Sequence, residues 1–229
     1  MSFYTSVARY GNSILYRGYN DSGRRVQKKV KFKPTLYIPS NKELGWKSID
    51  GRDVAPMIFD SMRDAKEFSD RYKDVSDFKV YGTQNYIHQY ITETFPDELV
   101  FNRPFINVCS IDIEVESDDG FPYPEDALKP INAICVKNNV DNIYHVWGLG
   151  KYSVAESEHG DKIKIDYTEC SSERELLTNY LNWWSREENC PDVVTGWNSR
   201  LFDIPYIVNR IGRVFGEDTA KQLSPWGLV

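Results

Sequence analysis

SIDIEV, residues 110–115, closes an apolar run that begins near Phe105. Its length and β-branched residues predict a buried strand, and the side chains of a strand alternate between its two faces. Asp112 and Glu114 therefore point to one side, and the isoleucines point to the other. Two carboxylates this close repel each other, so the pair predicts a raised pKa or a divalent metal such as Mg²⁺ or Mn²⁺. A solvated strand face with two ordinary surface acids is the alternative interpretation.

The composition indicates a globular protein with enough apolar residues for two modest domains. The chain has 229 residues, of which 41% are hydrophobic and 14% aromatic. It has no apolar run of the roughly 20 residues that a membrane span needs, and its start lacks a signal-peptide pattern. The four cysteines have no C-x-x-C spacing, which argues for reduced thiols and against a zinc site. We expect a soluble intracellular protein that does not bind a membrane.

Charge divides the chain into two parts with different surfaces. Residues 1–105 carry 17 Lys and Arg against 13 Asp and Glu, whereas residues 106–229 carry 11 against 21. The net charge of −6 argues against a nucleic-acid partner for the whole chain, but the first part taken alone is basic. Pro96 and Pro104 also precede the acidic strand. We therefore place a domain boundary between residues 105 and 106.

The first part is predicted to be an α+β domain. Strands are expected over residues 2–10 and 12–19, and the spacing of apolar residues after Ser61 predicts a helix with a buried stripe of Met62, Ala65, Phe68 and Tyr72. The segment between them alternates, with Val26, Val30 and Phe32 on one face and Arg25, Lys29, Lys31 and Lys33 on the other. This basic strand face could contact nucleic-acid phosphates, with nearby tyrosines stacking on bases, or could serve only to keep the surface solvated.

The second part is predicted to have the element order β-β-β-α-β-α. Strands over residues 131–136 and 142–148 should pair antiparallel with the acidic strand. Residues 149–170 are mixed and polar, and we interpret them as an irregular excursion. The capping box Ser172-x-x-Glu175 begins a helix with an apolar stripe over residues 172–187. A short buried strand over residues 192–196 then leads into a last amphipathic helix.

Asp203 lies just ahead of that last helix and has informative neighbours. The positive helix end should keep its carboxylate ionised, although a simple N-cap is the plainer interpretation. Residues 198–203, NSRLFD, fit the pattern N-x-x-x-F-D. D-I-E on a first strand, followed by N-x-x-x-F-D after a later strand, resembles the first two motifs of the 3′–5′ proofreading exonucleases. With VTGWN at 194–198 and FDIPYI at 202–207, the chain resembles the B-family DNA polymerases, especially those of the T-even-type bacteriophages.

This resemblance implies a fold and a reaction. Residues 1–105 would be the N-terminal domain. Residues 106–229 would be an α/β RNase H-like exonuclease domain, a mixed sheet with flanking helices that is truncated at its C-terminal end. Asp112, Glu114 and Asp203 would be catalytic and would hold two Mg²⁺ or Mn²⁺ ions for the hydrolysis of single-stranded DNA ends.

The resemblance also implies substrate contacts and partners. Asn198 and Phe202 would support the metal site and contact the end of the DNA strand, and Phe121 would help to part template from primer. Each phenylalanine could instead only anchor the loop or the core. Partners would include primer–template DNA, the rest of a polymerase chain and replication proteins such as a sliding clamp, in the cytoplasm of an infected bacterial host. The third motif of the family, Tyr-x-x-x-Asp, does not follow Asp203, so only weak cleavage by residues 1–229 is expected.

Two other functions are alternatives to nuclease activity, and only the first fits the sequence well. The first part could be a non-catalytic module that binds single-stranded DNA or RNA, as the RNA-level autoregulation of the T-even-type family suggests. Such binding should survive metal removal and substitution of Asp112 and Asp203. A glycosidase with Asp112 and Glu114 as its acid and base fits poorly, because two acids on one strand lack a second acidic strand across a cleft.

Overall fold

The computed structural model describes residues 2–76, 78–117, 120–158 and 162–229. The chain divides into two compact units, Met1–Arg103 and Pro104–Val229, slightly before the boundary that charge and prolines suggested. Each unit has its own hydrophobic core. Within the described part of the chain, no helix is long and apolar enough to cross a bilayer.

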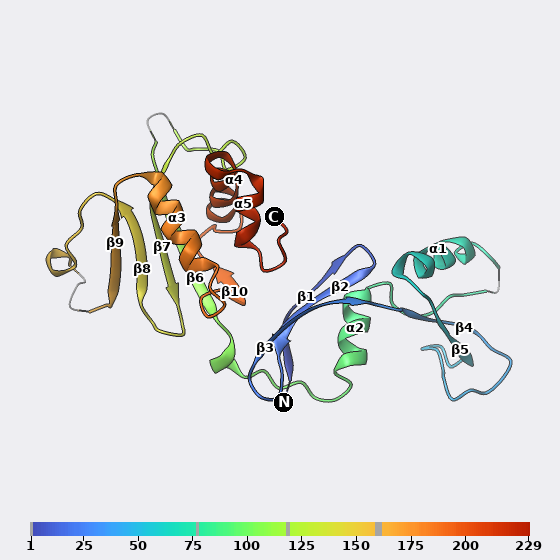
Figure 1. The fold of residues 1–229 in the computed structure, drawn as a ribbon. Coiled ribbons are helices and arrows are strands. Elements are labelled where there is room, and N and C mark those ends of the chain that lie inside the picture. The colour runs from blue at the N-terminus through green and yellow to red at the C-terminus, as the bar shows by residue number, and fades with distance from the viewer. Residues whose placement is uncertain (1, 77, 118–119, 159–161) are drawn as a thin grey trace. The chain divides into compact units, whose positions relative to one another are not determined.

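The first unit opens with three antiparallel strands, β1 (Phe3–Tyr10), β2 (Ser13–Tyr19) and β3 (Arg25–Lys31), as Figure 1 shows. Asn20 forms the turn from β2 to β3, because its Oδ1 accepts hydrogen bonds from the backbone amides of Ser22 and Arg24. A separate antiparallel pair follows, made by β4 (Thr35–Pro39) and β5 (Val54–Ile58).

Two helices complete this unit, α1 (Met62–Tyr72) and α2 (Tyr86–Thr94). Ser61 caps α1, because its Oγ accepts a hydrogen bond from the amide of Asp64 at 3.1 Å. Met62 and Ala65 are fully buried, whereas Phe68 is half-buried in an aromatic row between Phe59 and Tyr72. The helical spacing of the sequence therefore identifies the buried side of α1.

The second unit is a mixed α/β domain on a five-stranded sheet, entered through a 3₁₀ turn (Arg103–Phe105). The strands lie in the order β10-β6-β7-β8-β9, and they are β6 (Val108–Val115), β7 (Ile131–Asn138), β8 (Tyr144–Leu149), β9 (Ile165–Cys170) and β10 (Val193–Thr195). β6, β7 and β8 pair antiparallel, as predicted, whereas β9 and β10 run parallel to their neighbours. A second 3₁₀ turn (Val154–Glu156) precedes β9.

Helices α3 (Glu173–Trp184) and α4 (Asp203–Phe215) pack on one face of this sheet. The core joins Ile111 and Ile113 of β6 to Leu177 of α3 and Ile207 of α4. A short helix, α5 (Glu217–Ala220), and a 3₁₀ turn (Lys221–Leu223) follow α4. The face of β6 that carries Asp112 and Glu114 is therefore the one turned away from the core.

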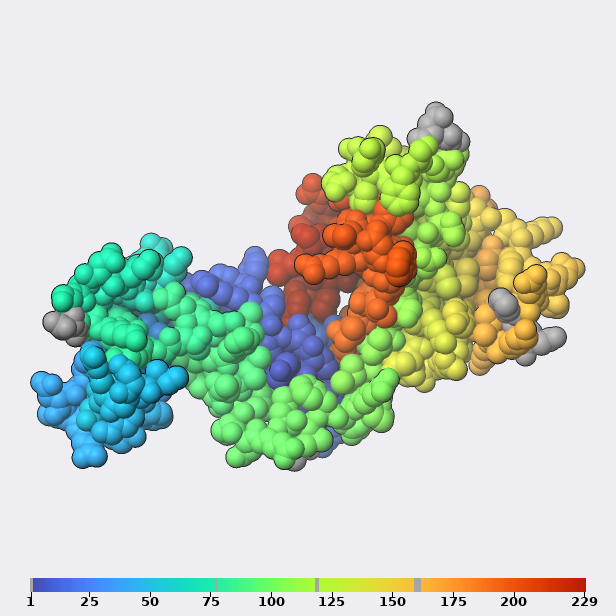
Figure 2. All heavy atoms as spheres, turned by 180° about the vertical axis from the view of Figure 1, so that it is seen from behind, coloured from blue at the N-terminus to red at the C-terminus, as the bar shows by residue number. Residues whose placement is uncertain are grey.

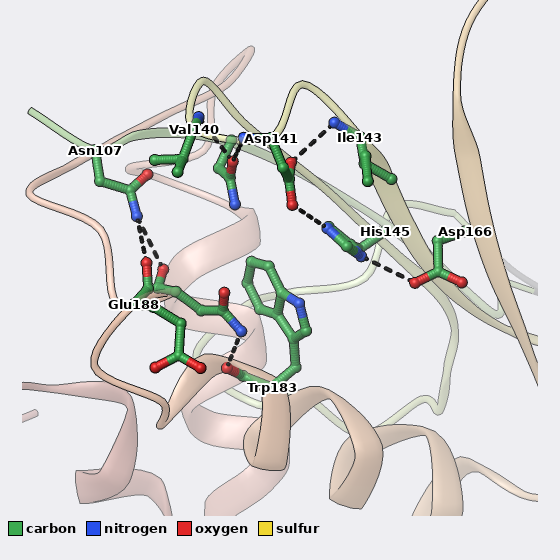
Figure 3. A network of polar contacts seen from close by, with 10 residues as sticks. Asn107, Val140, Asp141, Ile143, His145, Asp166, Trp183 and Glu188 are labelled. Atoms are coloured by element: carbon green, nitrogen blue, oxygen red, sulfur yellow. Dashed lines mark hydrogen bonds and ion pairs between the residues drawn. The ribbon is translucent and has the colours of Figure 1, made fainter. Parts of the chain in front are cut away.

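A polar network fixes the turn between β7 and β8, as Figure 3 shows. The two ring nitrogens of His145 lie between two carboxylates, with Nε2 3.0 Å from Asp141 Oδ2 and Nδ1 3.2 Å from Asp166 Oδ2. Burial alone would raise the pKa of Asp141, but hydrogen bonds from the Ile143 amide and from His145 outweigh it and lower this pKa. The network ties the turn to β9, so its acids have a structural role.

Three predictions about this unit need correction. The segment 149–170 is predicted to be irregular, but its residues 165–170 form β9. The mixed sequence of β9 is that of an edge strand. Residues 159–161 of the same segment lie outside the described part. β10 is an exposed edge strand and not a buried one. The capping box is half formed, because Ser172 Oγ accepts from the Glu175 amide while the Glu175 carboxylate turns back to Ser171.

Candidate functional site

The two carboxylates of β6 share one exposed side of the strand. Asp112 and Glu114 are exposed, whereas Ile111 and Ile113 are only 2% and 7% exposed on the other side. Their alternation is the direct result of strand geometry. The sequence did not indicate what faces Asp112 on the next strand, because that depends on register: Cys135 lies opposite, and burial together with the charge of Asp112 raises the pKa of its thiol.

Asp203 comes to the edge of the same strand from α4. Its Oδ1 accepts a hydrogen bond at 3.1 Å from the amide of Ile113, the residue between Asp112 and Glu114. The side chain is 3% exposed. Asp203 is the first residue of α4, and the N-cap is Phe202, so the simple N-cap interpretation is wrong. One bond across 90 residues of sequence brings the third acid beside the first two.

The electrostatics of Asp203 also differ from the expectation. The helix end was expected to favour the ionised carboxylate, but burial raises its pKa, and the nearby charge of Asp112 raises it further. Hydrogen bonds from the amides of Asp203 and Ile113 only partly offset this rise. A cation between Asp112 and Asp203 would relieve the repulsion, and carboxylate oxygens are the ligands that Mg²⁺ and Mn²⁺ prefer. Within the described residues, however, no three acidic, His or Cys side chains form a ready-made metal cage.

The turn from β10 into α4 explains how Asp203 reaches β6. A Cβ on Gly196 would lie 2.5 Å from the carbonyl oxygen of Ile111, so only glycine allows this approach. Asn198 then takes a left-handed conformation with φ of 57°, which asparagine tolerates better than most residues. Its carbonyl accepts from the amides of Leu201 and Phe202. Asn198 therefore shapes the backbone of the site, and its side chain is exposed.

Aromatic rings meet beside the acids. The ring centroids of Phe121 and Phe202 are 4.6 Å apart, and Phe202 also packs on Tyr206. Phe121 is 70% exposed, whereas Phe202 is half-buried against the core. Figure 2 shows the yellow-green loop that carries Phe121 beside the orange-red segment that enters α4. Trp197 is 94% exposed in the same turn, and no sequence pattern predicts this, because a single tryptophan has no periodic partner.

The basic residues of the first unit do not form one uniform face. Arg25, Lys29 and Lys31 share a side of β3, in agreement with the alternation. Lys29 lies over the ring of Tyr10 at 4.8 Å, and Arg25 Nη2 donates to the hydroxyl of Tyr19 at 3.1 Å. Lys33 lies beyond the strand and forms an ion pair with Asp60 at 2.7 Å. Its charge is therefore partly neutralised.

Comparisons with known proteins agree with the resemblance. A model of the exonuclease domain of DNA polymerase family B matches residues 72–227. The DNA-directed DNA polymerases of Escherichia phage RB69 and Enterobacteria phage T4 are 34% and 32% identical over 97% and 99% of this chain, which spans 27% of each relative. The DNA polymerase catalytic subunit of Elephantid herpesvirus 1 is 33% identical over 47% of the chain and 10% of the relative. The chain therefore belongs to DNA polymerase family B and covers its exonuclease domain.

Proposed function

We propose that the second unit hydrolyses single-stranded DNA from its 3′ end, in an RNase H-like site that uses Mg²⁺ or Mn²⁺. The observation that carries this proposal is the hydrogen bond from the Ile113 amide to Asp203, which brings a third carboxylate beside Asp112 and Glu114. Mg²⁺ is often held by one or two carboxylates together with substrate phosphates. An incomplete cage in the free protein is therefore compatible with a site that the DNA phosphate completes.

Each residue then has a defined task. Asp112, Glu114 and Asp203 supply hard oxygen donors around the scissile phosphate. Divalent ions held by these carboxylates would lower the pKa of an attacking water and would stabilise the leaving 3′ oxygen. The exposed ring of Phe121 stacks on the terminal base, and Phe202 supports that ring from the protein side. Asn198 holds the turn that presents Asp203.

A second candidate function belongs to the first unit. Lys29 and Lys31 are exposed on β3, and Tyr10 beside Lys29 is 48% exposed, so cations and an aromatic ring are adjacent. This combination suits single-stranded DNA or RNA. Primer–template DNA is proposed as a partner of the whole polymerase, because the phage relatives are DNA-directed DNA polymerases. A sliding clamp and other replication proteins are proposed from the family resemblance alone.

The test is cleavage of a 5′-labelled single-stranded oligonucleotide in Mn²⁺. Asp112→Ala should abolish shortening from the 3′ end. Glu169→Gln is the matched control, because Glu169 lies in the same cross-strand row as Glu114, three strands away, or about 14 Å at the usual strand spacing. Equal cleavage by wild type and Asp112→Ala would contradict the proposal, as would equal losses in both variants.

A further inference from the structure

The loop between β6 and β7 is held to α4 by side chains that the catalytic proposal does not use. Tyr206 Oη donates to the carbonyl of Lys129 at 2.8 Å and accepts from the Lys129 amide at 3.2 Å. Asn209 Nδ2 donates to the carbonyl of Pro124 at 2.9 Å. Because these bonds reach main-chain atoms, they fix the path of the loop, whichever side chains it carries.

Arg210 makes the densest set of these contacts. Its Nη1 donates to the carbonyls of Ala127 and Leu128 at 3.1 and 2.8 Å. Its Nε and Nη2 form a two-pronged ion pair with Glu173 at 2.8 and 2.7 Å, and both side chains are about 15% exposed. Glu173 Oε1 also accepts from the amide of Ile131, where β7 begins. The pair thus joins α3, α4, the loop and β7.

The conformation of the loop is strained and needs these contacts from α4, which together act as a clamp. Ala127 has φ of 41°, a left-handed conformation that is unfavourable for alanine, and its side chain is fully buried. Its carbonyl is one of the two that Arg210 holds. Upstream in the same loop, Phe121 rests on Phe202, the residue before Asp203. One helix therefore positions both a proposed metal ligand and the loop that carries the exposed ring.

We infer that Arg210, oriented by Glu173, is a positioning residue that fixes Phe121 relative to Asp203, so that the terminal base of a DNA strand lies in register with the acids. This inference rests on the proposed function. It assigns Arg210 no contact with the reacting atoms. A role limited to stability would leave substrate binding unchanged in any variant that remains folded.

The first measurement is hydrogen exchange of residues 120–131 in the whole chain without DNA. Arg210→Lys keeps the charge but loses the two-pronged pairing, and it should speed exchange of these amides by about tenfold while the Ile113 amide in β6 stays protected. Tyr206→Phe, which removes only a hydroxyl, should act in the same direction if Arg210→Lys unfolds. Arg213→Lys is the control, because Arg213 is exposed on the same helix. Unchanged exchange in both test variants would overturn the clamp.

The second measurement separates positioning from chemistry. An oligonucleotide with 2-aminopurine at its 3′ end reports stacking, and Arg210→Lys should weaken its binding in Ca²⁺ and raise KM about five- to tenfold with kcat nearly unchanged. Loosened exchange with unaltered KM and binding would overturn the inference. The wild-type protein could neither bind nor cleave the oligonucleotide, while Arg210→Lys still speeds exchange of residues 120–131. In that case the proposed function fails, and the positioning role of Arg210 in DNA binding fails with it. The exchange data would then show only that Arg210 holds the loop in place.

Discussion

At the β8–β9 side of the sheet, Asp141 and Asp166 have His145 between them, and a backbone amide completes the pairing of Asp141. Near the opposite edge, the carboxylates of Asp112 and Glu114 form no hydrogen bond or ion pair with any residue in the described ranges. The carboxylate of Asp203 has amide donors, but the charge of Asp112 repels it. Burial affects both groups, yet partners lower the pKa of Asp141 while the pKa of Asp203 is raised. Acids that are satisfied internally build structure; acids left in mutual repulsion are suited to bind a cation.

The largest expected effect is on cleavage by Asp203→Asn. Asparagine can still accept the bond from the Ile113 amide, so the fold should persist, but the charge that attracts a metal is lost. We expect kcat/KM for single-stranded DNA to fall by about a hundredfold or more, as small errors of placement already cost this much. Asp141→Asn, in the cluster of Asp141, Asp166 and His145, should leave cleavage unchanged. An equal loss of cleavage in this variant would contradict the functional difference between the two groups of acids.

The next effect is on the free energy of unfolding. Substitution of Asp141, beside His145, should lower it more than substitution of Asp203. Asp141→Ala removes the acceptor for His145 and for the Ile143 amide, so the free energy of unfolding should fall by about 1 kcal/mol, a value limited by the partial exposure of Asp141. Urea denaturation of wild type, Asp141→Ala and Asp203→Asn measures it. An equal or greater loss in Asp203→Asn would show that the Asp203 acid is mainly structural.

The two acids should also give opposite pH dependences, measured in EDTA. Because the folded-state pKa of Asp203 is raised, it binds its proton more tightly in the native state, and its contribution to stability decreases as the pH rises from the unfolded pKa through the folded one. The pKa of Asp141 is lowered, so its contribution is present above the unfolded pKa and is lost as the pH falls through the folded one. Denaturation at several acidic pH values should show slope changes of opposite sign for Asp203→Asn and Asp141→Asn. If both variants change the slope of stability against pH in the same direction, the opposite pKa shifts of Asp203 and Asp141 are wrong.

The smallest effect concerns the basic strand of the first unit. Replacing Lys29 and Lys31 with Glu should weaken binding of single-stranded nucleic acid and reduce its log–log salt slope by about 0.7 for each phosphate that the protein no longer neutralises. Lys33→Glu should matter less, because Lys33 is paired with Asp60. Filter binding over a salt series tests this prediction. If all three changes leave affinity and slope unaltered, the strand is only a solvated surface.

Local patterns made some of these features predictable. The alternation in β6 separated Asp112 from Ile111, and the stripe of α3 identified its buried side. β9 and β10 differ from the prediction because both are edge strands, whose residues are exposed or mixed in character. Two contacts depend on tertiary packing: the ion pair of Arg210 with Glu173 and the hydrogen bond from the Ile113 amide to Asp203. No sequence spacing predicts either contact. The sequence thus predicted that Asp112 and Glu114 share one face of their strand, and the fold determined the environment of each acid.

The most direct test of the metal site is Mn²⁺ binding, measured by electron paramagnetic resonance of free Mn²⁺ during titration of the protein with a short single-stranded oligonucleotide present. Wild type and Glu169→Gln should bind Mn²⁺ alike, whereas Asp112→Asn and Asp203→Asn should each bind it at least about tenfold more weakly. Equal Mn²⁺ affinity in all four proteins would contradict the claim that Asp112 and Asp203 hold a shared divalent ion.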